Sequence, residues 1–444
     1  MKVIIVGAGE VGRATAKNLQ SSHTVSIVDH DPAVVEELTY TMDVLPVSGD
    51  GTEIETLRAA GIEDADIVIA CTDDDEANIV ICGAAKTQSD AFTIARIRRR
   101  GLLETWERSQ GAFGVDFMIC MDLMTARAIF RISGLPAAQD VDIFAGGLVR
   151  MAEFNVTPES RLIEKSIEEI DTYDSLTFAG IFRNGEITIP TGESIIYGDD
   201  RVIVIGTRDA IETFSAELVT PDAGDPDEVV IVGGSEIGFQ VAREFESHGY
   251  RPRLIEKDPD RARELAESLP ETVVLESDGT DTEFLATEHV DEADVVIAAL
   301  DGDEKNLLVS LLARRIGVDR TIAVIENLEY ADLFETVGVD VAVNPREETA
   351  EEIVRFTRAD LTEQVAMLEN DRAEVIEKIV DDDSLLVGRT IQDAMADLPD
   401  AVVIGAISRG GEFIQPRGET VIEPGDHVVV FLETTIVKDV LGVL

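Results

Sequence analysis

The sequence contains two successive copies of one unit, and this duplication limits the possible folds more than any other feature. The segment KVIIVGAGEVGRATAKNL at 2–19 aligns with EVVIVGGSEIGFQVAREF at 228–245. Further along, SGDGT at 48–52 aligns with SDGT at 277–280, and DADIVIACTDDDEAN at 64–78 aligns with EADVVIAALDGDEKN at 292–306. Matches that keep their order over roughly a hundred residues indicate duplication of a whole domain.

Each copy begins with short apolar runs that alternate with amphipathic segments. In the first copy we expect buried strands at Val3–Val6, Val25–Val28, Ile67–Cys71 and Phe92–Ile97. The helices expected to connect the strands are Val11–Leu19, Ala33–Leu38, Ile54–Ala60 and Glu76–Thr87. Because such connections are right-handed crossovers, each copy is predicted to form an α/β domain with a doubly wound parallel Rossmann-type sheet.

Each predicted sheet is followed by a helical stretch, at Met121–Ser133 and Arg346–Arg358, and then by a small β-rich (α+β) domain. The Pro-x-Gly and Gly-Asp turns of IPTGESIIYGDDRVIVIG at 189–206 recur in IQPRGETVIEPGDHVVVFL at 414–432. The Pro/Gly/Asp-rich segment between Val219 and Glu228 is the expected linker. We therefore predict a Rossmann domain at 1–120, a helix with a small domain at 121–219, a second Rossmann domain at 228–343, and a second helix with a small domain at 344–444.

A glycine-rich loop follows the first predicted strand and precedes the first predicted helix. It comprises Gly7, Ala8, Gly9, Glu10, Val11 and Gly12. In this context the first glycine permits a tight turn, the second lets the backbone approach a pyrophosphate, and the third lets helix and strand pack closely. The amino end of the helix offers free N–H groups and partial positive charge to phosphates. The sequence therefore predicts a nucleotide site in the first copy.

Polar residues at the ends of the other strands complete this predicted site. Asp29 ends the second strand, where its carboxylate would accept hydrogen bonds from ribose hydroxyls and repel a 2′-phosphate, so NAD(H) is favoured over NADP(H). Thr52, Thr72 and Asp73 follow the third and fourth strands. Arg96 ends the fifth strand and is placed to reach a phosphate. The Asp-Gly-Thr sequence that ends at Thr52 is by itself also typical of a turn with a helix cap.

The matching loop of the second copy departs from this pattern. It comprises Gly233, Gly234, Ser235, Glu236, Ile237 and Gly238, with Glu256, Thr280 and Asp301 at the positions of Asp29, Thr52 and Asp73. Ser235 replaces the glycine that faces the pyrophosphate, and its side chain crowds the approach without closing it. Val324 replaces Arg96. The second copy is therefore either a weaker nucleotide site or a scaffold that has lost its ligand.

Acidic residues outnumber basic residues by 89 to 37, which gives a net charge of −52. They are interspersed with apolar segments, so we expect a folded chain rather than a disordered acidic tail. Such a surface suits a cytoplasm at molar salt, where charges are screened over short distances, and predicts a halophilic source. It argues against nucleic acid as a partner, because phosphates would be repelled.

Few residues in the sequence suit catalysis. Cys71, Cys82 and Cys120 lie in apolar or helical segments without CxxC spacing, so they are expected to be buried free thiols. None of the five histidines is expected to pair with a carboxylate in a cleft. A hydride-transfer enzyme needs a proton donor or acceptor beside the nicotinamide. We therefore predict no catalytic or metal-binding residues and interpret the chain as a nucleotide sensor. The alternative is an NAD-dependent oxidoreductase with an unrecognised substrate.

On these motifs the chain resembles the TrkA family, the regulatory NAD-binding subunits of Trk-type potassium uptake systems. The resemblance rests on both glycine loops, on the SGDGT and ADIVIACTDDDEAN segments and on both pairs of Pro-x-Gly and Gly-Asp turns, and it covers essentially the whole chain. It implies tandem RCK (KTN) N and C domains. It also implies a cytoplasmic protein at the inner face of the membrane that assembles into a homo-oligomeric ring, dimeric or tetrameric.

The resemblance further implies how such a protein acts. NAD(H) and, in relatives, ATP or ADP bind the Rossmann clefts, and the resulting conformational change gates an integral-membrane potassium channel or transporter. Carried over by motif, the first site comprises the loop at 7–12 with Asp29, Thr52, Thr72, Asp73 and Arg96, and the second comprises the loop at 233–238 with Glu256, Thr280 and Asp301. Regulation of a potassium efflux system is the other function that the resemblance leaves open.

Overall fold

The chain folds into two compact units, each of which combines corresponding domains of both copies. Unit 1 comprises Met1–Ile129 and Glu228–Thr357, and unit 2 comprises Phe130–Asp227 and Arg358–Leu444. The computed structural model describes residues 1–20, 23–109, 112–135, 137–156, 160–183, 186–198, 200–218, 228–357, 364–368, 372–382, 384–396, 398–399, 401–437 and 440. The predicted linker between Val219 and Glu228 lies outside the described residues.

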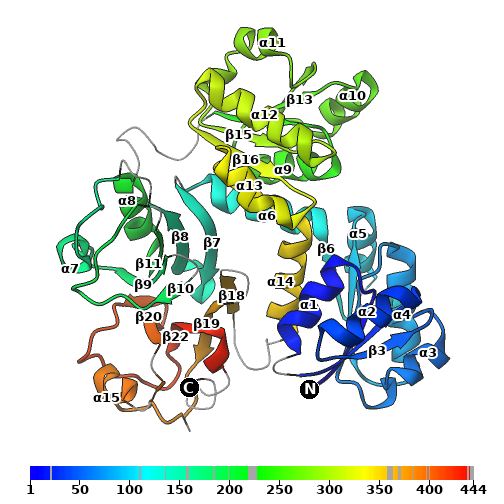
Figure 1. Ribbon diagram of the computed structural model, residues 1–444, viewed down its shortest axis with the longest axis horizontal. Coiled ribbons are helices and arrows are strands. Elements are labelled where there is room, and N and C mark those ends of the chain that lie inside the picture. Colours follow the sequence, from blue (N-terminus) through cyan, green and yellow to red (C-terminus); the bar gives the residue numbers. More distant parts are fainter. Residues whose placement is uncertain are drawn as a thin grey trace. The chain divides into compact units, whose positions relative to one another are not determined.

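In the first copy, unit 1 contains a six-stranded parallel sheet of order β3-β2-β1-β4-β5-β6. Figure 1 labels its two edge strands, β3 and β6. Its strands are β1 (Lys2–Val6), β2 (Thr24–Asp29), β3 (Leu45–Ser48), β4 (Ile67–Ala70), β5 (Phe92–Ile97) and β6 (Phe117–Cys120). The connecting helices are α1 (Glu10–Leu19), α2 (Pro32–Thr41), α3 (Ile54–Ala59), α4 (Asp75–Lys86) and α5 (Arg100–Arg108). The predicted doubly wound Rossmann-type sheet is confirmed, with a switch point between β1 and β4.

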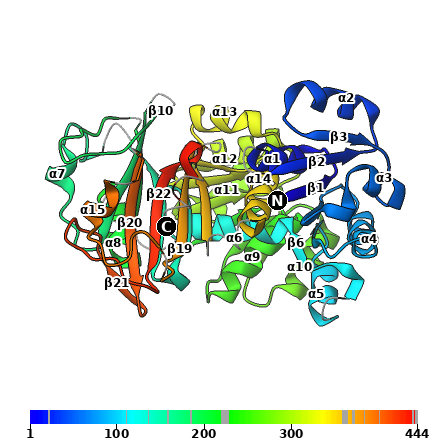
Figure 2. The same cartoon turned by 90° about the horizontal axis from the view of Figure 1, so that it is seen from below.

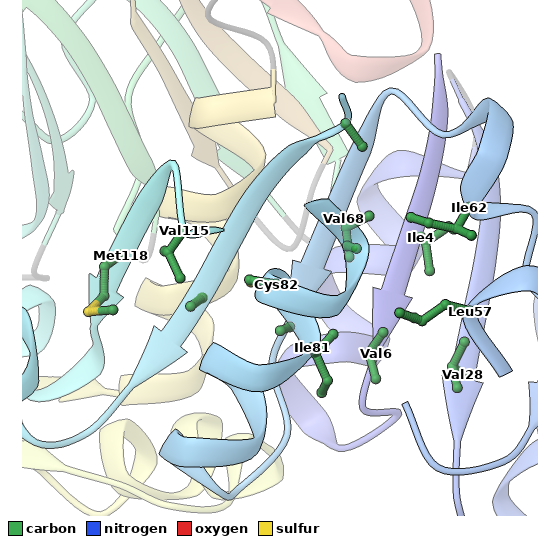
Figure 3. Packing of buried hydrophobic residues seen from close by; sticks show 14 of the residues in the cluster. Ile4, Val6, Val28, Leu57, Ile62, Val68, Ile81, Cys82, Val115 and Met118 are labelled. Carbon is green, nitrogen blue, oxygen red and sulfur yellow. The ribbon is translucent and has the colours of Figure 1, made fainter. Parts of the chain in front are cut away.

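Apolar packing explains why these segments form a buried sheet. On one face Ile4, Val6 and Val68 belong to a continuous cluster with Leu57 of α3 and Ile81 of α4 (Figure 3). Fully burying a side chain of this size contributes about 1.5–3 kcal/mol. The cluster therefore holds β1 and β4 together, and their carboxyl ends are the place where a doubly wound sheet binds its ligand.

The second copy repeats this sheet with the order β14-β13-β12-β15-β16-β17. Its strands are β12 (Val229–Val232), β13 (Arg253–Glu256), β14 (Val273–Glu276), β15 (Val295–Ala298), β16 (Arg320–Val324) and β17 (Val341–Val343). The helices are α9 (Glu236–Ser247), α10 (Pro259–Ser268), α11 (Thr282–Thr287), α12 (Asp303–Ile316) and α13 (Ala331–Thr336). The same fold in both copies confirms the prediction from the duplicated motifs.

One helix follows each sheet, as predicted: α6 (Met121–Ser133) in the first copy and α14 (Pro345–Thr357) in the second. Within unit 1, α14 of the second copy packs against α1 of the first, and the two lie side by side in both views (Figures 1 and 2). Phe356 lies near the carboxyl end of α14, and its ring stacks on two rings of the first sheet. The ring centroids are 3.8 Å apart for Phe117 of β6 and 5.4 Å apart for Phe92 of β5. The second copy therefore covers the edge of the first sheet.

Unit 2 contains two five-stranded antiparallel sheets, of order β10-β9-β11-β8-β7 and β18-β19-β22-β20-β21, which confirms the predicted β-rich domains. The strands are β7 (Ala138–Phe144), β8 (Val149–Asn155), β9 (Leu176–Arg183), β10 (Glu186–Thr188), β11 (Arg201–Gly206), β18 (Gln364–Leu368), β19 (Ala373–Ile379), β20 (Val402–Arg409), β21 (Glu412–Ile414) and β22 (His427–Glu433). Short helices are α7 (Ile167–Ile170), α8 (Arg208–Leu218) and α15 (Ile391–Met395).

The two small domains share one apolar cluster, so they pack face to face within unit 2. Glycines make this close approach possible, because a Cβ on Gly180 of β9 would lie 2.7 Å from the ring of Phe431, and one on Gly405 of β20 would lie 2.4 Å from Ile205. Among the described residues, we find no helix with the length and apolar character needed to span a bilayer.

Candidate functional site

A cleft of about 770 Å³, called the first cleft here, opens at the carboxyl ends of the strands of the first sheet. The predicted first-site residues that line it are Gly7, Ala8, Gly9, Glu10, Val11, Asp29, Thr52, Thr72, Asp73 and Arg96. Gly12 is not part of this lining and instead packs against the loop backbone. A Cβ at this position would lie 1.9 Å from the carbonyl oxygen of Gly7. The loop thus separates residues that face the cleft from a glycine that lets α1 pack tightly against it.

The other two glycines of the loop differ in what they permit. Gly7 has a φ of +104°, and a Cβ there would lie 2.8 Å from the backbone nitrogen of Thr72, so this turn requires glycine. At Gly9 the backbone is extended and a Cβ would meet open space. Within the described part of the chain, no side chain caps α1 at Gly9. The first-turn N–H groups therefore lack a side-chain acceptor, which is the arrangement that binds a phosphate.

Asp29 links the end of β2 to the glycine loop. Its Oδ2 accepts a hydrogen bond of 2.7 Å from the Ala8 backbone, and its Oδ1 accepts one of 2.9 Å from the Asp31 backbone. A carboxylate offers about four lone-pair sites, so two backbone donors leave room for ribose hydroxyls. The same bonds hold the loop against β2 and fix the shape of the cleft.

The expectation that no histidine pairs with a carboxylate in a cleft is wrong for His30. Its Nδ1 lies 3.4 Å from Asp29 Oδ1, and both residues line the first cleft. The His30 side chain is 88% exposed, and it follows Asp29 directly along the chain. A ring so open to water is strongly screened, so this pair lacks the burial that tunes a histidine for proton transfer.

Asp50 and Thr52 line the first cleft and also form the predicted turn. The Thr52 hydroxyl and backbone N–H donate to Asp50 Oδ1 at 2.7 and 2.8 Å. These bonds lower the pKa of Asp50 below its usual value, with the hydroxyl bond contributing most. Asp278 and Thr280 repeat the turn in the second copy, with the same effect on the pKa of Asp278. The motif therefore forms a rigid turn in both copies.

Arg96 is buried at the end of β5, with its side chain 3% exposed. Its Nη1 donates to the Thr72 carbonyl at 3.1 Å and to Asp73 Oδ1 at 3.2 Å. Its Nε has no hydrogen-bond partner among the described residues, although it is buried. A buried cation with an unused donor that lines a cleft is a natural partner for an anion.

The cysteines are buried and free, as predicted. Burial raises the pKa of the Cys71 thiol to about 12 and that of Cys120 to about 11, and it also raises the pKa of Cys82. Cys71 lines the first cleft. A thiol with so high a pKa stays protonated at neutral pH and is a poor nucleophile, so these residues act as apolar packing groups.

The second copy has a cavity of about 180 Å³ in the matching place, called the second cleft here. It is lined by Ile255, Lys257, Ser277, Asp278, Gly279, Thr280, Leu300 and Lys305. Of the predicted second-site residues, Thr280 is the one that this lining includes among the described residues, whereas the glycine loop, Glu256 and Asp301 lie outside it. The second cleft therefore does not gather the predicted set as the first does.

Ser235 forms hydrogen bonds within the second loop that its glycine counterpart cannot form. Its hydroxyl oxygen accepts a hydrogen bond of 3.2 Å from the Gly238 backbone and donates one of 2.6 Å to the Ala299 carbonyl. Ser235 thereby caps α9 and occupies the N–H group that a phosphate would use. Glu256 Oε2 accepts from the Gly234 backbone at 2.7 Å, as Asp29 does from Ala8. The acid and the turn are thus retained, but the amino end of α9 carries a side-chain cap.

One residue of the first cleft was missed by the sequence analysis. Arg346, the second residue of α14, reaches the first cleft from the second copy. Its Nη1 donates to Glu10 Oε2 at 2.8 Å and to the Glu326 carbonyl at 2.6 Å. The sequence holds no local signal for this contact, because the partners are 336 residues apart. At the matching position of the first copy stands Asp122, the second residue of α6.

A doubly wound sheet with a glycine loop at its switch point defines a Rossmann-type nucleotide-binding domain, here duplicated and joined to small β domains. Two solved structures share this architecture. The chain superposes on "Crystal Structure of the GsuK RCK domain" with a TM-score of 0.60 and 17% identity, covering 99% of this chain and 95% of that one. It superposes on "GsuK channel bound to NAD" with a TM-score of 0.61 and 18% identity, covering 99% and 79%. These likenesses establish the fold.

Comparison of sequences identifies the family. The TrkA-N domain model matches residues 3–120 and 229–345, and the TrkA-C domain model matches 151–219 and 375–441. The "Trk system potassium uptake protein TrkA homolog 1" of Methanosarcina mazei is 35% identical over 439 residues, 97% of each chain. The "Trk system potassium uptake protein TrkA" of Halomonas elongata is 34% identical, covering 97% of this chain and 96% of its own length. The chain belongs to the TrkA family.

Membership settles the general class of function. TrkA proteins are components of potassium uptake systems and regulatory subunits rather than enzymes, so the alternative of an NAD-dependent oxidoreductase is not supported.

Proposed function

We propose that this chain is a nucleotide-sensing regulatory subunit that gates a membrane potassium channel or transporter through a ligand-driven conformational change. The observation that carries the proposal is the first cleft. It combines a helix amino end at Gly9 that no described side chain caps, an acid at the ribose position in Asp29 and a buried cation in Arg96. These are the three groups that bind the pyrophosphate and ribose of a nucleotide.

The ligand we propose is NAD(H), with ADP or ATP as the competing physiological signal. Asp29 favours free ribose hydroxyls over a 2′-phosphate because a second negative charge would be repelled. The channel structure named above was solved with NAD bound, which supports a dinucleotide as the first ligand to test. The residues proposed to bind it are the loop at 7–12 with Asp29, Thr52, Thr72, Asp73 and Arg96.

We propose that α14 transmits the conformational change caused by the ligand. This helix belongs to the second copy and packs on the first. A ligand that binds one arrangement of the two copies more tightly shifts the population toward that arrangement. We propose that the chain forms a homo-oligomeric ring, dimeric or tetrameric, at the cytoplasmic face of an integral-membrane potassium transporter, and that this shift opens or closes the transporter.

Two measurements test the proposal. Titration of the full chain with NADH, followed by fluorescence, should show saturable binding, and incubation with a panel of ketones and hydroxy acids should show no hydride transfer. Rubidium uptake into vesicles that contain the cognate transporter should then change when the chain and NADH are added together. Absence of binding by NADH, ADP and ATP, or a flux that ignores the chain, would refute the sensor function.

The charge of the chain suggests how it docks. Cytoplasmic loops of membrane proteins are enriched in Lys and Arg, and this chain carries a net charge of −52. We therefore expect co-purification with the transporter to weaken as KCl rises from moderate to molar concentration. Retention of the complex at molar KCl would show that apolar packing rather than charge holds it.

A further inference from the structure

Arg346 is held at the first cleft by packing that begins at the other end of its helix. The ring of Phe356, near the carboxyl end of α14, stacks on Phe117 and Phe92 at the edge of the first sheet. Along its length α14 packs against α1, whose amino end carries Glu10 (Figures 1 and 2). The second copy thus delivers a cation to the glycine loop of the first copy on a helix that is anchored there.

The guanidinium of Arg346 is engaged in a way that a ligand can change. Its Nη1 binds Glu10 Oε2 at 2.8 Å and the Glu326 carbonyl at 2.6 Å. The side chains of Arg346 and Glu10 are 31% and 60% exposed, so their ion pair is weak in water. Both bonds come from Nη1, and the guanidinium fork has donors on its other nitrogens. The side chain can therefore turn toward a second acceptor while α14 stays in place.

The charges of the first cleft indicate what kind of group this second acceptor is. The lining carries the acids Glu10, Asp29, Asp31, Asp50, Asp73 and Asp74. Its guanidinium groups are Arg96 and Arg346. Arg96 is already shared with Asp73, so a pyrophosphate beside Gly9 would meet Glu10 without a full countercharge. Arg346, which contacts Glu10 itself, supplies the missing positive charge.

The second copy shows that this arrangement is not a general requirement of packing. Asp122 of α6 takes the position of Arg346, and it lines a separate cavity together with Glu236, the counterpart of Glu10. The matching helices therefore carry side chains of opposite charge at this position. The cavity beside Glu236 is also lined by Arg98, Arg99 and Arg100 of the first copy, so any cation near the second loop comes from the segment after β5 and not from α6.

We propose that Arg346 is a phosphate-binding residue of the first cleft, and that the pyrophosphate of a bound nucleotide replaces Glu10 as its partner. The proposal rests on nucleotide binding in the first cleft, as proposed above. The ligand class it selects is any nucleotide with a pyrophosphate next to its adenosine ribose. Because the residue belongs to the second copy, the bound phosphate ties the two copies of unit 1 together.

The test compares three probes on the full chain: NADH, ADP and adenosine, which lacks phosphate. Arg346→Ala should weaken NADH and ADP binding roughly tenfold or more, since hydrogen bonds between two charged groups are the strong ones, and should change adenosine binding less than twofold. The control is Arg263→Ala, which removes the same charge from an exposed ion pair on α10 and should change none of the three. Equal losses for ADP and adenosine, or no loss beyond the control, would overturn the proposal.

A second variant keeps the test decisive if Arg346→Ala fails to fold. Glu10→Gln removes the competing partner and the repulsion of the phosphate, so ADP should bind a few-fold more tightly. Weaker ADP binding by Glu10→Gln would contradict the exchange of partners. A wild-type chain that binds neither NADH nor ADP would instead refute the proposed function, whereas normal binding by Arg346→Ala would refute this inference alone.

Discussion

The two glycine loops have the same fold and the same turn, yet they differ in what fills the phosphate position. In the first loop the helix amino end at Gly9 has no side-chain cap among the described residues, whereas in the second the Ser235 hydroxyl binds Gly238 N–H. The clefts beside them measure about 770 and 180 Å³. One added hydroxyl group thus satisfies the backbone group that a ligand would otherwise use. Duplication has preserved the fold of both copies while the features of a binding site are concentrated in one.

The largest effect we expect concerns stability, and it should be equal in the two copies. A Cβ on Gly12 would lie 1.9 Å from the Gly7 oxygen, and one on Gly238 would lie 2.0 Å from the Gly233 oxygen. Either alanine variant should therefore lose about 3 kcal/mol or more of its free energy of unfolding. Urea denaturation measures this, and a large loss in one copy alone would show that the loops do not share a packing role.

Nucleotide binding, in contrast, should respond to one copy. Asp29→Ala and Glu256→Ala remove equivalent hydrogen bonds to their loops, from Ala8 and Gly234, so each controls for the other's structural damage. Asp29→Ala also removes the proposed ribose acceptor and should weaken NADH binding about 30-fold or more. Glu256→Ala should change it less than twofold. Similar losses from both variants in an NADH titration would mean that the second cleft also binds ligand.

The self-cap can be transferred to the first loop. Position 9 has room for a Cβ, so Gly9→Ser should fold normally. Its hydroxyl is expected to accept from Gly12 N–H, as Ser235 accepts from Gly238, and to weaken ADP binding about tenfold. Calorimetric titration with ADP measures the loss, and an unchanged melting temperature serves as the control. Undiminished ADP affinity would show that a serine cap at this position does not hinder phosphate binding.

A smaller effect on stability is expected from Asp122, the acid of α6 at the position that Arg346 takes in α14. Burial and the nearby Glu236 raise the pKa of Asp122 to about 6 from its usual 3.8, so its ionised form is disfavoured in the folded chain. A raised acid pKa means that folding favours the protonated form, so the contribution of Asp122 to stability falls as pH rises from about 4 through 6. Asp122→Asn should therefore stabilise the chain by about 1–2 kcal/mol at pH 7.5 and by nearly nothing at pH 4. Denaturation curves at the two pH values would show no such difference if Arg98 compensates the charge.

Much of the fold was predictable because its signals are local. The apolar runs around Ile4 and Val68 identified the central strands, and the glycine spacing placed the first turn of α1. The substitution of Ser235 for a glycine already indicated a weaker second site. The hydrogen bond from Gly238 N–H to the Ser235 hydroxyl was not predictable. A serine at this position can either crowd the approach of a ligand or cap the helix, and the two cases differ only in the rotamer of its hydroxyl group.

The contribution of Arg346 and the pairing of His30 with the Asp29 carboxylate in the first cleft also escaped prediction. In a sequence, Arg346 is an ordinary residue in the first turn of a helix, beside two glutamates. Its proximity to Glu10 follows from the packing of α14 against the first copy, which depends on side chains such as Phe356 that are distant from both loops. The position of His30 relative to the Asp29 carboxylate depends on the backbone path that follows β2.

The sequence by itself determined the duplicated architecture, the TrkA family and the difference between the two glycine loops. These properties follow from the spacing of apolar residues and glycines, which acts over a few positions of the chain. Only the tertiary structure decided that like domains of the two copies combine into units, that Ser235 caps the helix of its own loop, and that the first cleft is completed by a residue of the other copy. Such contacts depend on how preformed elements pack over hundreds of residues, and no local pattern records them.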